Sequence, residues 1–99
     1  MGVEDDLQRL ELVVARIRAV TPHAGARGPS VRLLLDCGPR GEREALLAEP
    51  PADTAGLVGR QLVCALAADG ALVLTAHSHA RGLVLVGPDR EVEDGTTVA

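Results

Sequence analysis

The residues whose types and spacing most suggest chemistry lie in the stretch TAHSHARG, residues 75–82. Here His77 and His79 are two positions apart, with Ser78 between them. Histidine transfers protons near neutral pH and is a common metal ligand, so the pair suggests a metal site or a proton-transfer site. Ser78 lacks the orienting carboxylate that a serine–histidine triad needs. The competing interpretation is the turn of a hairpin, with both histidines in solvent.

Cys37 and Cys64 are the other candidate metal ligands, and they lie 27 positions apart (64 − 37). Zinc sites typically use ligand pairs only a few residues apart, and neither cysteine forms such a pair. Two cysteines within apolar strands of a cytoplasmic chain are most often buried free thiols. No glycine-rich phosphate loop, nucleophile elbow or HExxH motif occurs either. We therefore predict that the protein is not an enzyme and has no catalytic residue, metal site or cofactor.

The composition restricts how this chain can bind nucleic acid. None of its 99 residues is aromatic, and all ten basic residues are arginine. The core must therefore consist of Leu, Val and Ala, and no ring is available to stack on an unpaired base. This disfavours single-stranded nucleic acid as a ligand. Arginine contacts with the phosphates of a folded RNA remain compatible with the sequence.

The net charge of −4 is unevenly distributed along the chain. Residues 1–15 have a net charge of −3, residues 16–43 one of +4, and residues 44–99 one of −5. A basic segment in an acidic chain is compatible with a localised anion-binding face. The alternative is a set of solvated charges at strand edges. The arginines that we predict to bind RNA are Arg16, Arg18, Arg27, Arg32, Arg40 and Arg43.

The hydrophobic pattern is that of an all-β chain with short connections. Apolar and polar residues alternate imperfectly in the first long apolar segment, so we expect a bulge or strong curvature there. Acidic residues near the start favour a short helix over residues 3–9. Strands are predicted over residues 10–20, 30–37, 42–48, 61–67, 71–76 and 82–86, with a short terminal strand at 96–98.

The segment 49–60 interrupts the strands with two prolines and predicts one helical turn capped by Asp53 or Thr54. A helical insertion between the third and fourth strands suggests an OB-fold, which is a five-stranded Greek-key barrel. We predict a single OB-fold domain over residues 1–99, with the terminal strand as an extension. The acidic start and the lack of an apolar run of ~18 residues predict a cytoplasmic protein with no membrane partner.

The late strands are apolar on both faces, as in LVCALA (62–67) and LVLV (83–86). One face of such a strand can fill the barrel, and the other then needs a cover. We expect a homodimer interface to supply that cover.

Three stretches, in the same order, resemble the CsaA-like tRNA-binding domains. The stretch 57–63, LVGRQLV, is similar to the family's Leu-Ile-Gly-x-Gln-Val-Val, and 85–99 is similar to its closing Leu-x-Pro-Asp-x-x-Val-x-Asn-Gly-x-x-Val-Ala. The stretch 10–41 resembles the family's first two strands and the loop between them. The matching residues there are Pro22, Ala26, Arg27, Pro29, Arg32, Leu33, Asp36, Gly38, Pro39 and Gly41.

This resemblance implies an OB-fold homodimer that binds the outside of folded tRNA. Some family members are described as export-related chaperones that bind unfolded polypeptides, and neither activity is enzymatic. The resemblance is to a shortened and divergent member, because the family's polar segment between the fourth and fifth strands corresponds here to 68–70, Ala-Asp-Gly. His23 and Cys37 also replace family aromatics.

The sequence therefore predicts a non-enzymatic module that binds structured RNA such as tRNA through its arginine-rich face. The alternative is a homodimeric module that binds unfolded polypeptide or another protein and has lost RNA binding. The stretch 75–82 falls where the family has a variable hairpin connection, which favours a turn with His77 and His79 in solvent.

Overall fold

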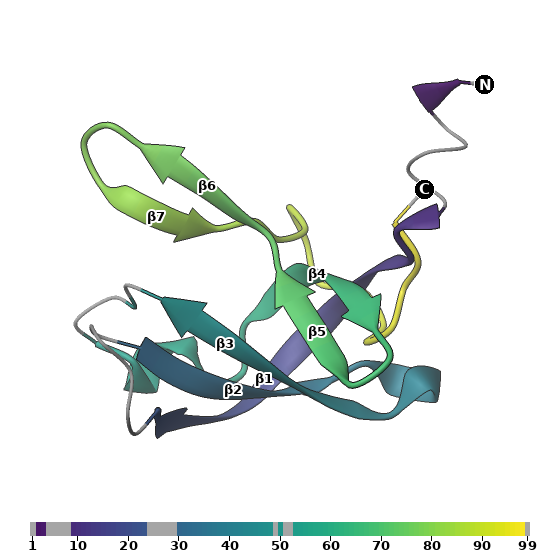
Figure 1. The fold of residues 1–99 in the computed structure, drawn as a ribbon, viewed down its shortest axis with the longest axis horizontal. Helices are drawn as coiled ribbons and strands as arrows, with labels where there is room; N and C mark the ends of the chain where they lie inside the picture. The colour runs from purple at the N-terminus through teal and green to yellow at the C-terminus, as the bar shows by residue number, and fades with distance from the viewer. Residues whose placement is uncertain (1, 4–8, 24–29, 49, 51–52, 99) are drawn as a thin grey trace.

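The computed structural model describes residues 2–3, 9–23, 30–48, 50 and 53–98 (Figure 1). Regular structure in this part of the chain consists mainly of short antiparallel strands joined by tight turns. The elements are β1 (Leu12–Pro22), β2 (Ser30–Asp36), η1 (Gly38–Arg40), β3 (Glu42–Ala48), η2 (Ala55–Leu57), β4 (Gln61–Ala67), β5 (Gly70–Val73), β6 (Thr75–Ser78) and β7 (Gly82–Leu85), where η denotes a 3-10 helix.

The first five strands form one curved sheet in the order β3-β2-β1-β4-β5, with every neighbouring pair antiparallel. The sheet curls until β5 meets β3, so the barrel is nearly closed. At this meeting point a Cβ on Gly70 would lie only 2.9 Å from the carbonyl oxygen of Glu44, so a larger residue would separate the two strands. The predicted all-β, OB-fold-like barrel is confirmed.

The first strand carries the predicted bulge. Its pairing with β2 shifts register between Ile17 and Ala19, which leaves Arg18 as the extra residue. The bulge adds curvature, so the 11-residue strand can pair with β4 through its first half and with β2 through its second. Arg16 lies at the crossover, opposite Asp36 on one neighbour and Gln61 on the other.

The barrel interior is aliphatic, as the composition requires. Alternating residues of β1 and β2 point inward, and each has an exposed fraction close to zero. Cys37 and Cys64 belong to this core as free, fully buried thiols, as predicted. The largest fully buried side chains are Val13, Ile17, Leu33, Leu35, Leu57, Leu62 and the two cysteines.

A second apolar cluster lies on the outer face of β1 and β4. Leu12, Val14 and Val63 are buried there, and Val92 and Val98 of the C-terminal segment pack against them. Backbone hydrogen bonds join the C-terminal segment 95–98 to Leu12 and Val14 of β1. The predicted terminal strand is present only as a single antiparallel bridge between Val13 and Thr97. The chain itself therefore covers part of the apolar face that the sequence assigned to a partner subunit.

The predicted strand over 71–76 is divided in the structure. Leu74 packs in the outer cluster, where its N–H donates to the carbonyl of Val63 on β4 and its carbonyl accepts the N–H of Val86, which follows β7. The chain then enters a separate hairpin, β6–β7, which extends away from the barrel (Figure 1). Half of the predicted turn is thus strand β6, because 75–78 pairs with β7.

The reversal itself spans 79–81, and both histidines of the stretch are exposed, as predicted. Ser78 Oγ accepts hydrogen bonds from the backbone N–H groups of Ala80 and Arg81, at 3.3 and 3.2 Å, which fixes the turn.

Two further predictions concern short helices. The insertion between β3 and β4 contains η2, a single 3-10 turn, while residues 49 and 51–52 of that insertion lie outside the described part. The helix predicted over 3–9 falls largely on residues 4–8, which also lie outside it. Among the described residues, no helix has the length and apolar character needed to span a membrane.

Candidate binding surfaces

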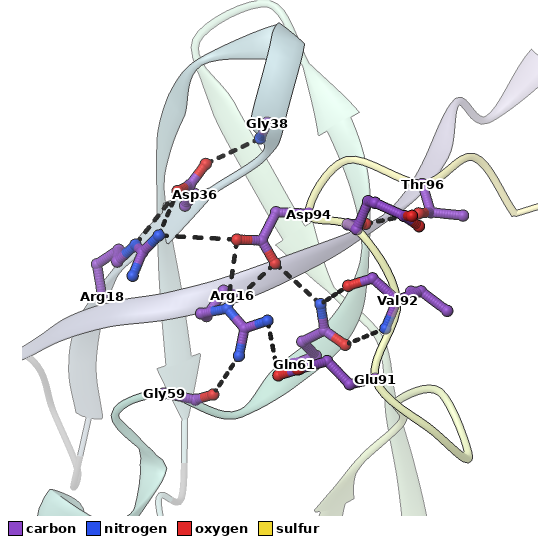
Figure 2. Close-up of polar contacts among 11 residues, drawn as sticks. Arg16, Arg18, Asp36, Gly38, Gly59, Gln61, Glu91, Val92, Asp94 and Thr96 are labelled. Carbon is purple, nitrogen blue, oxygen red and sulfur yellow. Dashed lines mark hydrogen bonds and ion pairs between the residues drawn. The ribbon is translucent and has the colours of Figure 1, made fainter.

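Four of the six arginines predicted to bind RNA contact carbonyl or carboxylate oxygens of this chain. Arg16 and Arg18 lie beside Asp36 and Asp94 at one end of the barrel (Figure 2). Arg40 and Arg43 bond to other parts of the barrel. Arg27 lies outside the described residues.

Arg16 is saturated by intramolecular partners. Its Nε donates to both carboxylate oxygens of Asp94, at 3.2 and 3.3 Å, and its Nη1 donates to the carbonyl of Gly59 at 2.9 Å. Its Nη2 forms an ion pair with Glu91 at 2.9 Å. The hydrogen bond that Arg16 donates to Asp94, followed by the one it donates to Glu91, raises the pKa of Arg16 above its usual value. This guanidinium therefore holds the C-terminal segment on the barrel and has no free fork for a phosphate.

Arg18 forms an ion pair with Asp36 on the neighbouring strand β2. Its Nη2 lies 2.8 Å from Asp36 Oδ2 and 3.7 Å from Asp94 Oδ2. Asp36 Oδ1 also accepts the backbone N–H of Gly38 at 2.9 Å. The Arg18 hydrogen bond and then the Gly38 bond lower the pKa of Asp36. Arg16 and Arg18 both lie within ion-pair distance of Asp94, and Arg18 also pairs with Asp36.

Gln61 completes this cluster from β4. Its Nε2 donates to the carbonyl of Val92 at 2.7 Å and to Asp94 Oδ1 at 2.9 Å, while its Oε1 accepts the N–H of Val92 at 3.1 Å. The side chain thus bonds both backbone groups of one residue in the C-terminal segment. Gln61 thus connects two of the stretches that resemble the CsaA-like family, 57–63 and 85–99, and holds the second against the barrel.

Arg43 and Arg40 also bridge parts of the barrel. Arg43 Nη1 donates to the carbonyls of Ala67 and Gly70, joining β3 to the β4–β5 turn where the barrel closes. Arg40 Nη1 donates to the carbonyl of Gly95 at 3.4 Å. Arg32 differs, because it is exposed on β2 and its side chain has no bonded partner among the described residues. Two of the six predicted arginines, Arg16 and Arg18, are therefore paired with carboxylates, and Arg40 and Arg43 are bonded to carbonyl groups of the fold.

The structure reveals a surface that the charge pattern did not predict. Arg60, which lies in the acidic segment 44–99, borders two adjoining depressions. One is an open polar hollow of about 430 Å³ that Arg16 and Arg90 also line. The other is an apolar groove of about 190 Å³ between the barrel and the β6–β7 hairpin. Only tertiary structure brings these segments together, so no sequence spacing could indicate them.

The two cysteines have the properties of structural thiols. Burial is the main cause that raises the pKa of both, that of Cys64 to about 12. A thiol that stays protonated is a poor nucleophile and a poor metal ligand. No cluster of three or more metal-ligating side chains occurs in the part of the chain that the structure describes.

The strand order and the closure of β5 on β3 define a module of the OB-fold class. Solved structures that match it include the CsaA chaperone of Picrophilus torridus (TM-score 0.86, 21% identity) and that of Bacillus anthracis str. Ames (TM-score 0.80, 25% identity). A MetRS-related protein from Pyrococcus horikoshii also matches, with a TM-score of 0.80 and 14% identity.

Each of these matches covers 100% of this chain, and they cover 100%, 99% and 98% of the three relatives respectively. The chain is therefore CsaA-like, and the resemblance inferred from its sequence is confirmed. No protein-family model matches the sequence, and no curated protein does so either.

Proposed function

We propose that this chain is a non-enzymatic module whose ligand is unfolded polypeptide. The observation that carries this proposal is the apolar groove beside the β6–β7 hairpin, bordered by Val84, which is 38% exposed. Exposed aliphatic side chains of this size commonly mark a surface that binds another polypeptide. Two of the structural relatives are named as chaperones.

The charges favour polypeptide over RNA. Arg16 and Arg18 are neutralised by Asp36, Asp94 and Glu91, so they add little to a positive field. The chain has a net charge of −4 and no aromatic residue. A protein that binds RNA mainly through phosphates needs free cations arranged over one face.

A permanently unfolded, carboxymethylated client protein tests the proposal. We expect the module to bind this client in fluorescence anisotropy and to slow its aggregation at low molar ratio. The native form of the same client is the control, because it does not expose apolar segments. Equal binding of native and unfolded client, or none of either, contradicts the proposal.

Structured RNA, such as tRNA, is the second candidate ligand. It is favoured by Arg32, an exposed guanidinium with no partner among the described residues, and by the resemblance to CsaA-like tRNA-binding domains. A mobility-shift titration with bulk tRNA at two salt concentrations tests it. Binding that weakens with salt and with Arg32→Glu supports RNA as the ligand. The absence of a shift at low salt excludes it.

We also propose that the module acts as a homodimer in the cytoplasm. The C-terminal segment covers Leu12, Val14 and Val63, but Leu46 and Leu72, which line a hollow separate from the groove, remain exposed within the described part. A second copy packed on this remaining apolar surface would remove it from water. Light scattering at micromolar concentration should give twice the chain mass of 10.3 kDa. A monomeric mass across that range contradicts the proposal.

A further inference from the structure

The apolar groove is the right size for one side chain. Its volume of about 190 Å³ is below the ~300 Å³ at which pockets for drug-sized ligands begin. Leu47 and Leu57 form its buried part and belong to the main core, so this wall is fixed. The lining residues are Leu47, Leu57, Thr75, Leu83, Val84 and Leu85, together with Arg60.

One strand borders the groove along its edge. Leu83, Val84 and Leu85 are consecutive in β7, and neighbouring side chains of a strand point to opposite faces. All three can line one groove only where the edge of the strand faces it. β7 pairs with β6 alone among the described strands. A segment lying in the groove in extended conformation would therefore run beside an open strand edge, which extended peptides commonly use.

Arg60 lies where the groove meets the polar hollow. It is exposed and lines both depressions, as Leu85 does. Its side chain has no hydrogen bond or ion pair among the described residues. The other cations of the hollow are less available. Arg16 is saturated, and Arg90 lies 3.7 Å from Asp89.

The acids around the hollow are already paired. Glu91 is the carboxylate of the lining, and it bonds Arg16 at 2.9 Å. Asp94 bonds the same guanidinium. Arg60 is thus the cation beside the groove whose charge is not balanced by a described neighbour. An occupant of the groove that carries a carboxylate would balance it, whereas a lysine or arginine at that position would be repelled.

We propose that the groove selects extended polypeptide segments in which a Leu-sized side chain is followed closely by an acidic residue. The apolar side chain enters the groove, and the carboxylate pairs with Arg60. This inference rests on the proposed polypeptide binding and adds a preference to it. It identifies Arg60 as the residue that sets the charge of the preferred client.

Three fluorescein-labelled, C-terminally amidated decapeptides test this preference. They share a Gly/Ser frame around Leu-Leu-Xaa-Leu, where Xaa is Asp, Asn or Lys. Because the pair is exposed to solvent, the wild-type module should bind the Asp peptide about threefold to fivefold more tightly than the Asn peptide in fluorescence anisotropy. It should bind the Lys peptide most weakly. Arg60→Glu should reverse the order of the Asp and Lys peptides.

The matched control is Arg81→Glu, which makes the same charge change at an exposed arginine that lines neither depression. It should keep the wild-type order. Circular dichroism of both variants checks that they fold. Binding of all three peptides with equal affinity, or an order that Arg60→Glu leaves unchanged, overturns the preference but not polypeptide binding. Binding of none of them, nor of the unfolded client, overturns both.

Competition separates this site from an RNA phosphate site. Unlabelled tRNA should not displace the Asp peptide from the wild-type module. Displacement that disappears in Arg60→Glu would assign Arg60 to RNA and overturn the inference.

Discussion

Asp94 accepts hydrogen bonds from Arg16 through both carboxylate oxygens, at 3.2 and 3.3 Å, although 78 positions separate the two residues. Both side chains are largely shielded, with exposed fractions of 17% and 19%. The contact joins the first strand of the barrel to the segment that covers its outer face. Arg16 therefore helps to hold the C-terminal segment on the barrel.

Asp94→Asn should destabilise the fold. The substitution removes the carboxylate that Arg16 and Arg18 share, while the amide keeps the size of the side chain. We expect the midpoint temperature of unfolding to fall by several degrees. Differential scanning calorimetry measures this. Glu91→Gln is the control, because Glu91 is 72% exposed and should matter less. Equal effects of the two substitutions would contradict this account of the contact.

Asp36 should make the stability depend on pH in the acid range. Its pKa is lowered in the fold from the ordinary 3.8, because Arg18 and the Gly38 N–H bond the ionised form. The stabilisation is therefore complete above pH 3.8 and is lost as the pH falls through the lower, folded-state value.

Urea midpoints measured from pH 2 to 6 test this directly, in the range set by that pKa. At pH 6 the urea midpoint of the wild type should be higher than that of Asp36→Asn. The difference between the two midpoints should vanish as the pH approaches 2. A difference that stays constant across the range would show that ionisation of Asp36 is not its cause.

Gly38→Ala should disrupt the junction between the turn after β2 and the C-terminal segment. A Cβ at this position would lie 2.0 Å from the carbonyl oxygen of Asp94, and the residue has φ +60. We expect destabilisation by at least ~3 kcal/mol, or failure to fold. Chemical denaturation followed by circular dichroism measures it.

Gly41→Ala provides the matched comparison. Gly41 has φ +81 in the same turn, but a Cβ there meets nothing within 4 Å. With its ψ of −162, Gly41 lies in a backbone region that essentially only glycine occupies, so the substitution should incur backbone strain alone, about 1–3 kcal/mol. If the two substitutions cost the same, close packing against Asp94 is not what requires glycine at position 38.

The thiols should be unreactive in the folded protein. With its pKa raised to about 12, Cys64 would be ionised to only about one part in ten thousand at pH 8. Both side chains are also fully buried. Ellman's reagent should therefore react with the native protein far more slowly than with protein unfolded in guanidinium chloride. Rapid native reaction would show that the core opens readily.

The fold was largely predictable because its signals are local. β2, β3 and β4 match the predicted strands within one residue, since apolar runs bounded by Gly and Pro define them. The division of the strand over 71–76 was not predictable. It depends on Leu74 packing against the outer cluster, which involves residues distant in the sequence.

The binding surface was less predictable, for an electrostatic reason. Counting charges along the chain identified residues 16–43 as basic, which is correct for the sequence. Whether an arginine is free depends on which acid lies beside it in space. Asp94, from the acidic C-terminal segment, neutralises Arg16, while Arg60 has no partner among the described residues although residues 44–99 carry a net negative charge.

The sequence by itself determined the all-β class, the aliphatic core, the bulge in the first strand and the likeness to CsaA-like proteins. These follow from side-chain alternation, turn residues and motif order, all of which are properties of neighbouring positions. Tertiary structure alone decided which arginines form ion pairs within the fold and which border a groove. Ion pairing depends on the distances between side chains in the folded protein, and these distances cannot be read from the positions of the residues in the sequence.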